Sequence, residues 1–366
     1  MIREDHTALV PLAGAGKSLE TRAGAARHYA GRRALTLALG VLRLGPVVIL
    51  GLLIALSSVL SDVFLSFENV GNVLKQSAVV CVLALGQLLV VLTRGIDLSV
   101  GSNLSLSAVV GASVWRDHES APLAIAAALA TGGLVGAVNG LLYVKGRLPH
   151  PFIPTLAMLA AASGLALLLS DSRPIQGAPP IVNTIGGGRL SWIPGGDAIG
   201  WFPIAALVVA AVAVLVLLVT RRLVWGRWIY CVGGNPEAAA RNGIPVPSVL
   251  VSVYVLSGLL AGVAALLTMG KGNAGSPTSG ALAELDAIAA VIIGGASFLG
   301  GRGTVVNALT GALIIAVMRN GLNLLGIDPN WQYMATGAVI VLAVELDVLR
   351  AQLESRFRSL QAVTPS

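Results

Sequence analysis

Residues 74–101 read LKQSAVVCVLALGQLLVVLTRGIDLSVG, an apolar run with one charged side chain that ends in a turn containing Arg94 and Asp97. About twenty apolar residues are enough for an α-helix to cross the hydrocarbon core of a bilayer. Inside that core no water satisfies the backbone polar groups, so an apolar run of this length must be helical. The stretch therefore predicts a transmembrane helix over residues 74–93.

The rest of the chain repeats this pattern. Of its 366 residues, 55% are hydrophobic and 11% are charged, whereas about a quarter of the residues in a soluble domain are charged. Several apolar segments are short or interrupted by glycine, and we expect some of them to be half-helices or re-entrant pieces. The sequence predicts an all-α, polytopic integral membrane protein with about ten transmembrane or partly spanning helices. Beyond 74–93, the expected segments are 44–61, 98–115, 121–144, 151–170, 200–220, 247–269, 286–301, 303–325 and 330–346.

The apolar segments divide the chain into three parts. Residues 1–43 are rich in Ala, Gly and Arg without apolar periodicity, and we expect a largely disordered basic cytoplasmic tail. Residues 44–346 form the transmembrane domain, and residues 347–366 form a cytoplasmic C-terminal tail.

The basic residues predict the orientation of the chain in the membrane. With the N-terminus inside, the inner segments hold 18 Lys and Arg residues and the outer segments hold six. Cytoplasmic loops carry the excess of Lys and Arg, so both termini are expected in the cytoplasm. Loops 171–199 and 270–285 are then periplasmic, and loop 221–247 is cytoplasmic. We interpret the net charge of +7 as this topology signal and not as a nucleic-acid-binding surface.

Loop 221–247 contains a short helix with its own start and stop signals. Asn235 is expected to cap the helix, with Pro236 and Glu237 in its first turn. Gly243 suits the left-handed position that ends a helix. Because a simple connector rarely needs a capped helix, we favour a protein-docking surface over an ordinary connector. The residues assigned to it are Asn235, Pro236, Glu237, Ala238, Ala239 and Gly243.

A second group of candidates lies in and around the turn at 94–101. Arg94 and Asp97 are three residues apart at the end of an apolar run, where charges are costly and are usually paired or functional. One interpretation is a structural salt bridge, and the other is a gate or pathway wall. Amides and hydroxyls within the apolar runs suit a weakly polar conduit, although each also suits hydrogen bonding between helices. The gate or pathway candidates are Arg94, Gly95, Asp97, Ser99, Gly101, Asn103, Gln87, Asn139 and Asn307, with Gln332 as a further polar position.

Glycines at regular spacing indicate close helix packing. Gly132, Gly136 and Gly140 repeat every fourth residue, and Gly258 and Gly262 do the same. Small residues at this spacing let two helix backbones approach closely in lipid. We expect these faces to pack helices together without any ligand.

Several of these motifs resemble a known family. Residues 237–239 (EAA), followed after three residues by Gly243, look like the EAA---G loop of binding-protein-dependent ABC permeases. The stretches 95–101 (GIDLSVG), 233–239 (GGNPEAA), 289–295 (AAVIIGG) and 300–304 (GGRGT) are similar to the ribose/xylose-type sugar permeases. Together they cover most of residues 70–346 in the family's order.

The resemblance implies a multi-pass permease subunit in a bacterial inner membrane. It implies import of a monosaccharide such as a pentose, with another small polar solute (a nucleoside or a branched-chain amino acid) as the alternative. The implied partners are an ATP-binding subunit that docks on loop 221–247, a periplasmic sugar-binding protein, a second permease chain and membrane lipid. ATP and Mg would act on the ATP-binding subunit, so no cofactor is expected on this chain.

Two other classes of function fit the sequence less well. An intramembrane enzyme would need a nucleophile–base pair, a carboxylate dyad or a metal site, and no predicted apolar run contains a histidine or two carboxylates. An ion-coupled secondary transporter usually carries ionisable groups at mid-membrane, whereas Arg94, Asp97 and Arg319 lie near segment ends. The GAGKS-like stretch at 14–18 follows Pro11 where a nucleotide-binding loop needs glycine. We therefore expect a non-catalytic chain without a metal site.

Overall fold

The computed structural model describes residues 45–191, 200–328 and, with internal gaps, 330–352. The predicted N-terminal tail and nearly all of the C-terminal tail lie outside the described residues, as does part of loop 171–199. Residues Pro46–Asp347 form one compact unit.

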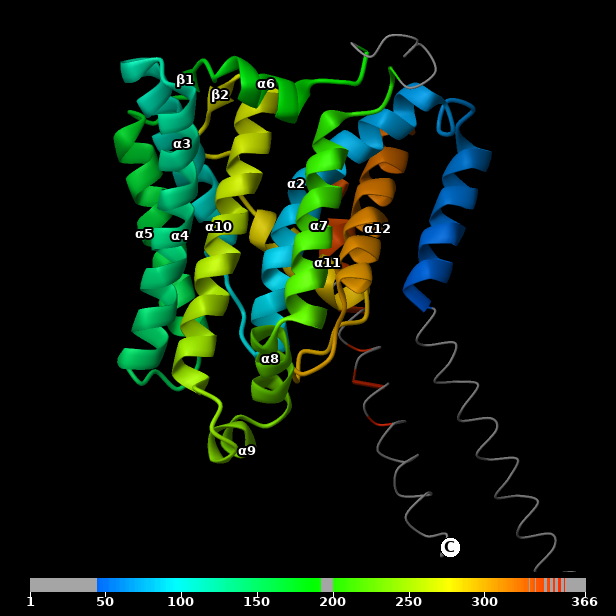
Figure 1. The fold of residues 1–366 in the computed structure, drawn as a ribbon. Coiled ribbons are helices and arrows are strands. Elements are labelled where there is room, and N and C mark those ends of the chain that lie inside the picture. Colours follow the sequence, from blue (N-terminus) through cyan, green and yellow to red (C-terminus); the bar gives the residue numbers. More distant parts are fainter. Residues whose placement is uncertain are drawn as a thin grey trace, which may run out of the picture. The chain divides into compact units, whose positions relative to one another are not determined.

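The compact unit is built from helices (Figure 1). Six of the described helices are long and apolar enough to cross a membrane. These are α2 (Phe67–Leu92), α4 (Ala121–Lys145), α5 (Phe152–Leu169), α7 (Ile204–Arg222), α10 (Val246–Gly272) and α12 (Val305–Leu324). The other described elements are a helix at Gly45–Leu60, α3 (Val100–His118), α6 (Pro180–Gly187), α8 (Val224–Gly234), α9 (Pro236–Arg241), α11 (Ala283–Ile293) and two short strands, β1 (Ile175–Gln176) and β2 (Ala274–Gly275).

The mostly helical membrane architecture is confirmed, and the expected count of about ten transmembrane or partly spanning helices stays a prediction. One expected segment is shorter than the sequence suggested. It is the run 286–301, where α11 ends at Ile293 after 11 residues. Gly295, Gly300 and Gly301 follow in the left-handed region, with φ of 97°, 76° and 69°, so the backbone leaves the helix at this point. At about 1.5 Å per residue, α11 is about half as long as the hydrocarbon core is thick.

The two ends of the unit carry different elements. Strands β1 and β2 pair antiparallel, with Ile175 opposite Gly275, and lie beside α6 at the end we call the ribbon end (Figure 1). The short helices α8 and α9 lie at the opposite end, which we call the α9 end (Figure 1). The long helices run between these two ends.

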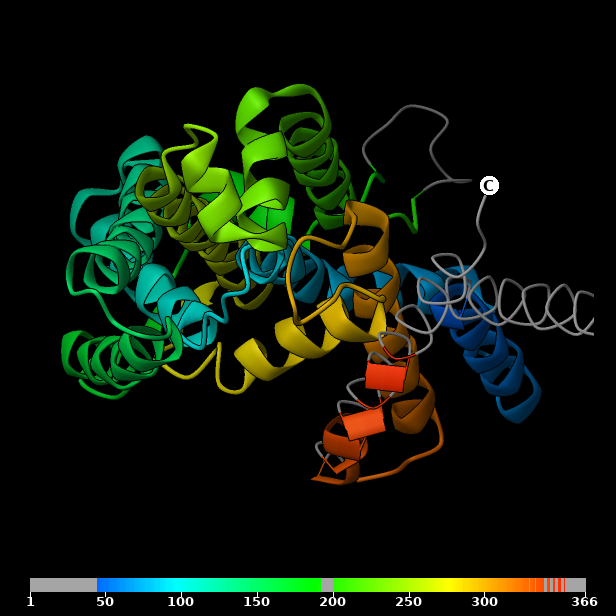
Figure 2. The same cartoon turned by 90° about the horizontal axis from the view of Figure 1, so that it is seen from below.

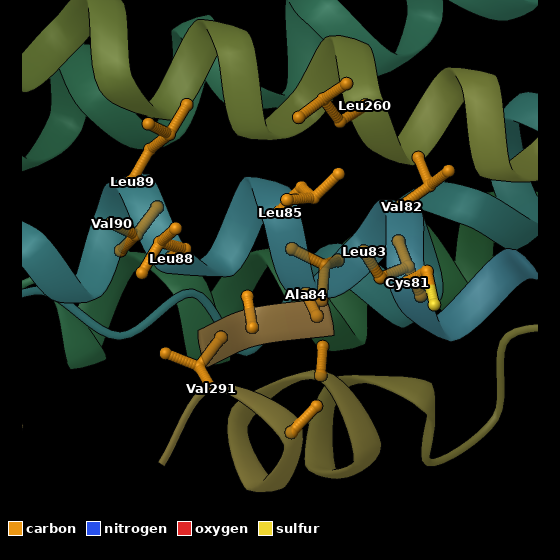
Figure 3. Packing of buried hydrophobic residues seen from close by; sticks show 14 of the residues in the cluster. Cys81, Val82, Leu83, Ala84, Leu85, Leu88, Leu89, Val90, Leu260 and Val291 are labelled. Atoms are coloured by element: carbon orange, nitrogen blue, oxygen red, sulfur yellow. The ribbon is translucent and has the colours of Figure 1, made fainter. Parts of the chain in front are cut away.

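Helix α2 lies at the centre of the packing. Its leucines and valines pack against Leu260 of α10 on one side and Val291 of α11 on the other (Figure 3). Figure 2 shows α11 between α2 and α12, in contact with both. The glycine faces pack as predicted, because an added Cβ at Gly132 would collide with the carbonyl oxygen of Gly258, and one at Gly136 with that of Tyr254. The helices α4 and α10 therefore cross at backbone contact.

Two long helices are each followed by a break that turns back into the unit. Helix α2 ends at the α9 end, and the chain returns through residues 93–99 before α3 starts at Val100. Helix α10 ends at the ribbon end, and the chain returns through residues 276–282 before α11 starts at Ala283 (Figure 1). We call these the first and the second break. They enter from opposite ends, so the starts of α3 and α11 meet in the interior.

Candidate functional site

Helix α9 has the start and the stop that its sequence predicts. The Asn235 side chain accepts a hydrogen bond from Ala238 N at 3.0 Å, and Pro236 is the first residue of the helix. Gly243 follows with φ of 80°, a conformation that favours glycine. The side chain of Glu237 is 85% exposed, whereas Ala239 is buried. The result is a short, rigid helix that presents its charged face to the surroundings.

The residues just before α9 join it to the ends of other helices. Arg94 Nε donates to the carbonyl oxygen of Gly233 at 2.6 Å, and Arg94 Nη2 donates to that of Gly234. Gly301 N donates to Leu92 O at 2.9 Å. A Cβ at Gly233 would collide with Leu92 O, so the contact needs glycine. We call Leu92, Arg94, Gly233, Gly234 and Gly301 the junction.

Tyr230 adds a further link between α8 and the turn that follows α11. Its hydroxyl donates to Gly303 O at 2.9 Å. Burial raises the pKa of the Tyr230 phenol, and the charge of Arg221 opposes this shift. The phenol therefore keeps its proton and remains a hydrogen-bond donor.

The salt-bridge interpretation of Arg94 and Asp97 is wrong for this structure. Both residues are described, and no ion pair joins them: the Arg94 guanidinium binds the end of α8, while Asp97 Oδ1 accepts from Ser99 N at 2.9 Å and from Ser99 Oγ at 2.7 Å. Arg94 has φ of 65°, so the turn is not helical. A three-residue spacing brings side chains together on a helix, and that rule does not apply here.

Most of the other predicted polar candidates gather around Asp97. Asn139 Nδ2 donates to Ser99 Oγ at 2.8 Å. The Gln87 carboxamide, oriented with its nitrogen towards Asp97 O, bonds both backbone groups of Asp97 at 3.2 Å. Asn103 Nδ2 donates to Gly132 O at 3.1 Å. We call Gln87, Asp97, Ser99, Asn103 and Asn139 the polar network.

The polar network is fully enclosed by protein. Its five side chains belong to residues that are at most 1% exposed. In this conformation they hold the first break between α2, α3 and α4. Gly95 lies beside them, and a Cβ there would come within 2.6 Å of the Tyr254 hydroxyl. Its glycine is required by this close approach.

The remaining candidates lie elsewhere. Asn307 is at the start of α12, where its amide donates to Gly294 O and its carboxamide oxygen accepts from Thr304. It therefore holds the turn between α11 and α12. Gln332 donates to Asn323 Oδ1 at 2.6 Å.

A cavity of about 260 Å³ lies where the starts of α3 and α11 meet, and the sequence did not indicate it. Gly101 is part of this meeting point, because a Cβ there would collide with Glu284 Oε2 and with the carbonyl oxygen of Gly280. Gly280 N also donates to Ser105 Oγ at 2.8 Å. Glu284 reads as the end of a surface loop in the sequence, yet it is buried. The polar side chains that line the cavity are Ser102, Ser105, Ser163, Thr278 and Glu284.

The sequence also missed a partly buried ion pair. Arg319 of α12 binds both carboxylate oxygens of Asp286 on α11 at 2.6 Å. Arg319 Nη2 also donates to Thr336 Oγ1 at 3.3 Å. The pair fixes the first turn of α11 against α12.

Comparison with known proteins identifies the family. The family model for the permease component of branched-chain amino acid transport systems matches residues 69–344. The ribose import permease of Escherichia coli K12 is 39% identical over 303 residues, which cover 81% of this chain and 90% of that protein. The fructose import permease of Rhizobium meliloti is 37% identical over 306 residues, covering 82% and 84% of the two chains. The galactose/methyl galactoside import permease of Haemophilus influenzae is 33% identical over 320 residues, covering 83% and 92%.

No solved structure matches this chain. The curated relatives confirm the resemblance that the motifs at 95–101, 233–239 and 289–304 indicate. With helices apolar enough to span a bilayer and a family match across its membrane domain, the chain belongs to the branched-chain amino acid transport permease family of inner-membrane proteins.

Proposed function

We propose that this chain is the transmembrane subunit of an ABC importer that forms the translocation path for a monosaccharide. ATP hydrolysis on a separate subunit, which holds ATP and Mg, drives the transport. Relatives that cover most of this chain are import permeases for ribose, fructose and galactose, which supports a sugar as the substrate. A nucleoside or a branched-chain amino acid is the alternative.

Helix α9 is the proposed docking surface for the ATP-binding subunit. The observation that carries this role is its connection to the junction. Gly233 and Gly234 come directly before α9 in the chain, and they bind Arg94. Leu92 is the last residue of α2, Arg94 lies in the first break, and Gly301 lies in the turn after α11. A displacement of α9 would therefore reach two parts of the unit, the end of α2 and the turn after α11, through these contacts.

The proposed topology places α9 and both termini in the cytoplasm and the ribbon end in the periplasm. The excess of Lys and Arg in the segments at the α9 end supports this orientation. A periplasmic sugar-binding protein then docks at the ribbon end, and a second permease chain completes the path. The exposed apolar side chains of α5 and α7 are available to lipid or to that second chain.

The decisive test is uptake by the reconstituted importer. The chain, its ATP-binding subunit and its binding protein are placed in proteoliposomes with internal ATP, and uptake of labelled D-ribose, D-fructose and D-galactose is compared with that of L-leucine and a nucleoside. We expect Glu237→Lys and Gly243→Asp to reduce both co-purification of the ATP-binding subunit and sugar uptake. Glu119→Lys, a charge reversal far from α9 at the ribbon end, is the matched control for co-purification of the ATP-binding subunit. Normal subunit binding and uptake in both α9 variants would exclude α9 as the docking surface, and uptake of leucine alone would exclude a sugar.

A further inference from the structure

The cavity between the starts of α3 and α11 has the chemical character of a ligand site. Its volume of about 260 Å³ suits one small molecule, since sites for larger ligands begin at about 300 Å³. Both breaks contribute to it: α3 supplies Ser102 and Ser105, and the second break supplies Thr278 and Glu284. The α5 helix closes one side with Ser163 and Leu159. An apolar surface and several converging hydroxyls are therefore brought together at one place.

Glu284 is the unusual member of this lining. It is 8% exposed, and among the described residues its carboxylate accepts a hydrogen bond from its own backbone N–H and none from another side chain. Its nearest charged neighbour is another carboxylate, Asp286, whose own charge is taken up by Arg319. Buried carboxylates are almost always partnered. One that lines a cavity without a donor or a cation from another side chain points to a ligand that supplies hydrogen-bond donors.

The position of Glu284 explains how an acidic side chain is tolerated there. Its residue lies in the first turn of α11, and Oε2 lies against Gly101 in the first turn of α3. Helix N-termini carry free N–H groups and positive partial charge. Two such termini offset part of the cost of burying the carboxylate, which accepts a hydrogen bond from its own backbone N–H and keeps further acceptor positions.

The lining favours a neutral polyol over a cation. A carboxylate offers about four acceptor positions, and each serine or threonine hydroxyl both donates and accepts. A hydrated divalent cation would require several oxygen ligands and usually more than one carboxylate, and the described residues contain no group of three acidic, histidine or cysteine side chains. Leu159 and Pro277 supply an apolar surface for the C–H face of a sugar ring.

We propose that this cavity is a monosaccharide-binding site within the translocation path, in which Glu284 accepts hydrogen bonds from sugar hydroxyls and Ser102, Ser105, Ser163 and Thr278 complete the polar contacts. The inference rests on the proposed function. It assigns the sugar contacts to the second break and the start of α3, and not to the enclosed polar network.

The experiment uses the complete importer in proteoliposomes, with its binding protein at saturating concentration. The probe is whichever of D-ribose, D-fructose and D-galactose the native chain imports fastest, together with its monodeoxy analogues. Glu284→Gln keeps the shape and removes the charge. Ser163→Leu fills the cavity from α5, and Ala161→Leu adds the same bulk at an exposed position of the same helix that does not line it.

We expect uptake to fall about tenfold or more in Glu284→Gln and Ser163→Leu, because each variant removes or blocks hydrogen bonds to a charged acceptor. In Ala161→Leu we expect uptake to stay within about twofold of the native value. Glu284→Gln should reduce uptake of at least one monodeoxy analogue much less than uptake of the parent sugar, since that analogue lacks the hydroxyl that Glu284 binds. The amount of assembled complex is measured in parallel, and Ser163→Ala replaces any variant that fails to assemble.

Two results would overturn the site while leaving the proposed function intact. The first is that the native importer takes up the sugar, and that Glu284→Gln and Ser163→Leu take it up as fast as Ala161→Leu does. The other is an equal loss for the parent sugar and every analogue in Glu284→Gln, which would make Glu284 a structural residue. Absence of uptake of all three sugars by the native importer would instead refute the proposed substrate class.

Discussion

Replacing Arg94 with asparagine tests whether the junction transmits movement from α9. Arg94 donates to the carbonyl oxygens of Gly233 and Gly234, the last two residues of α8. Carbonyls at the C-terminal end of a helix lack intrahelical partners and carry negative partial charge, so a guanidinium suits them. Asparagine tolerates the left-handed backbone of this position, where φ is 65°, but it is too short to reach α8. The variant therefore removes the link and keeps the turn.

The size of the effect follows from the two hydrogen bonds. A hydrogen bond from a charged donor contributes about 1.5–3 kcal/mol when buried. Arg94 is exposed, and water screens its charge, so we expect about 2 kcal/mol for both bonds together. This corresponds to about a 30-fold change in the equilibrium between an attached and a detached α8–α9 segment.

The assay measures ATP hydrolysis and sugar uptake in the same proteoliposomes. We expect Arg94→Asn to keep the ATP-binding subunit in the complex and to increase, about tenfold or more, the number of ATP molecules hydrolysed per sugar imported. In Arg94→Lys the number of ATP molecules hydrolysed per sugar should lie between the values for Arg94→Asn and the native chain, because lysine keeps the charge but lacks the fork of donors. Arg147→Asn is the matched control, since Arg147 is also exposed and has φ of 50°. An unchanged ratio in Arg94→Asn would refute the junction as the link.

Two further predictions concern charged side chains in the interior. Asp97→Asn should lower the amount of folded protein in detergent, and adding Arg94→Gln should not restore it. The two side chains have separate partners, so the effects of the two substitutions should add. Restoration by the double variant would support a salt bridge between the two residues. Asp286→Asn should reduce stability by about 3 kcal/mol, since it leaves Arg319 without its partner in a poorly solvated place. Thermal unfolding in detergent should show that Asp286→Leu combined with Arg319→Met recovers most of this loss, and a further loss in that double variant would contradict the prediction.

The features that the sequence predicted are those with local causes. A transmembrane helix needs only an apolar run of sufficient length, and the run at 74–93 coincides with α2 up to its last residue, Leu92. The start and stop of α9 depend on Asn235 and Gly243, which act on backbone groups within a few residues. The glycine faces of α4 and α10 follow from a spacing that any helix turns into one face.

The features that the sequence missed depend on contacts between distant residues. Residues 276–282 read as a surface loop because they are rich in Ser, Gly and Pro. Gly280 is nevertheless buried, because it packs against Gly101 and its N–H donates to Ser105, a residue 175 positions away. The burial of Glu284 follows from that contact. An apolar run such as 286–301 has the same composition whether its helix starts at the surface or halfway through the membrane.

The geometry also connects the proposed docking helix with the proposed sugar site. Helix α11 starts at the cavity with Glu284 in its first turn and ends at Ile293, before the turn that contains Gly301. Gly301 contacts Leu92 and lies beside Gly233, which comes shortly before α9. A helix of 11 residues is about 16 Å long and behaves as a rigid rod. If a shift of α9 displaces Gly301 and the turn at 294–301 carries that displacement to Ile293, α11 moves as a unit, and the carboxylate of Glu284 at its other end moves against the start of α3. The same displacement would change the shape of the cavity, so a ligand that binds there should in turn alter ATP hydrolysis on the partner subunit.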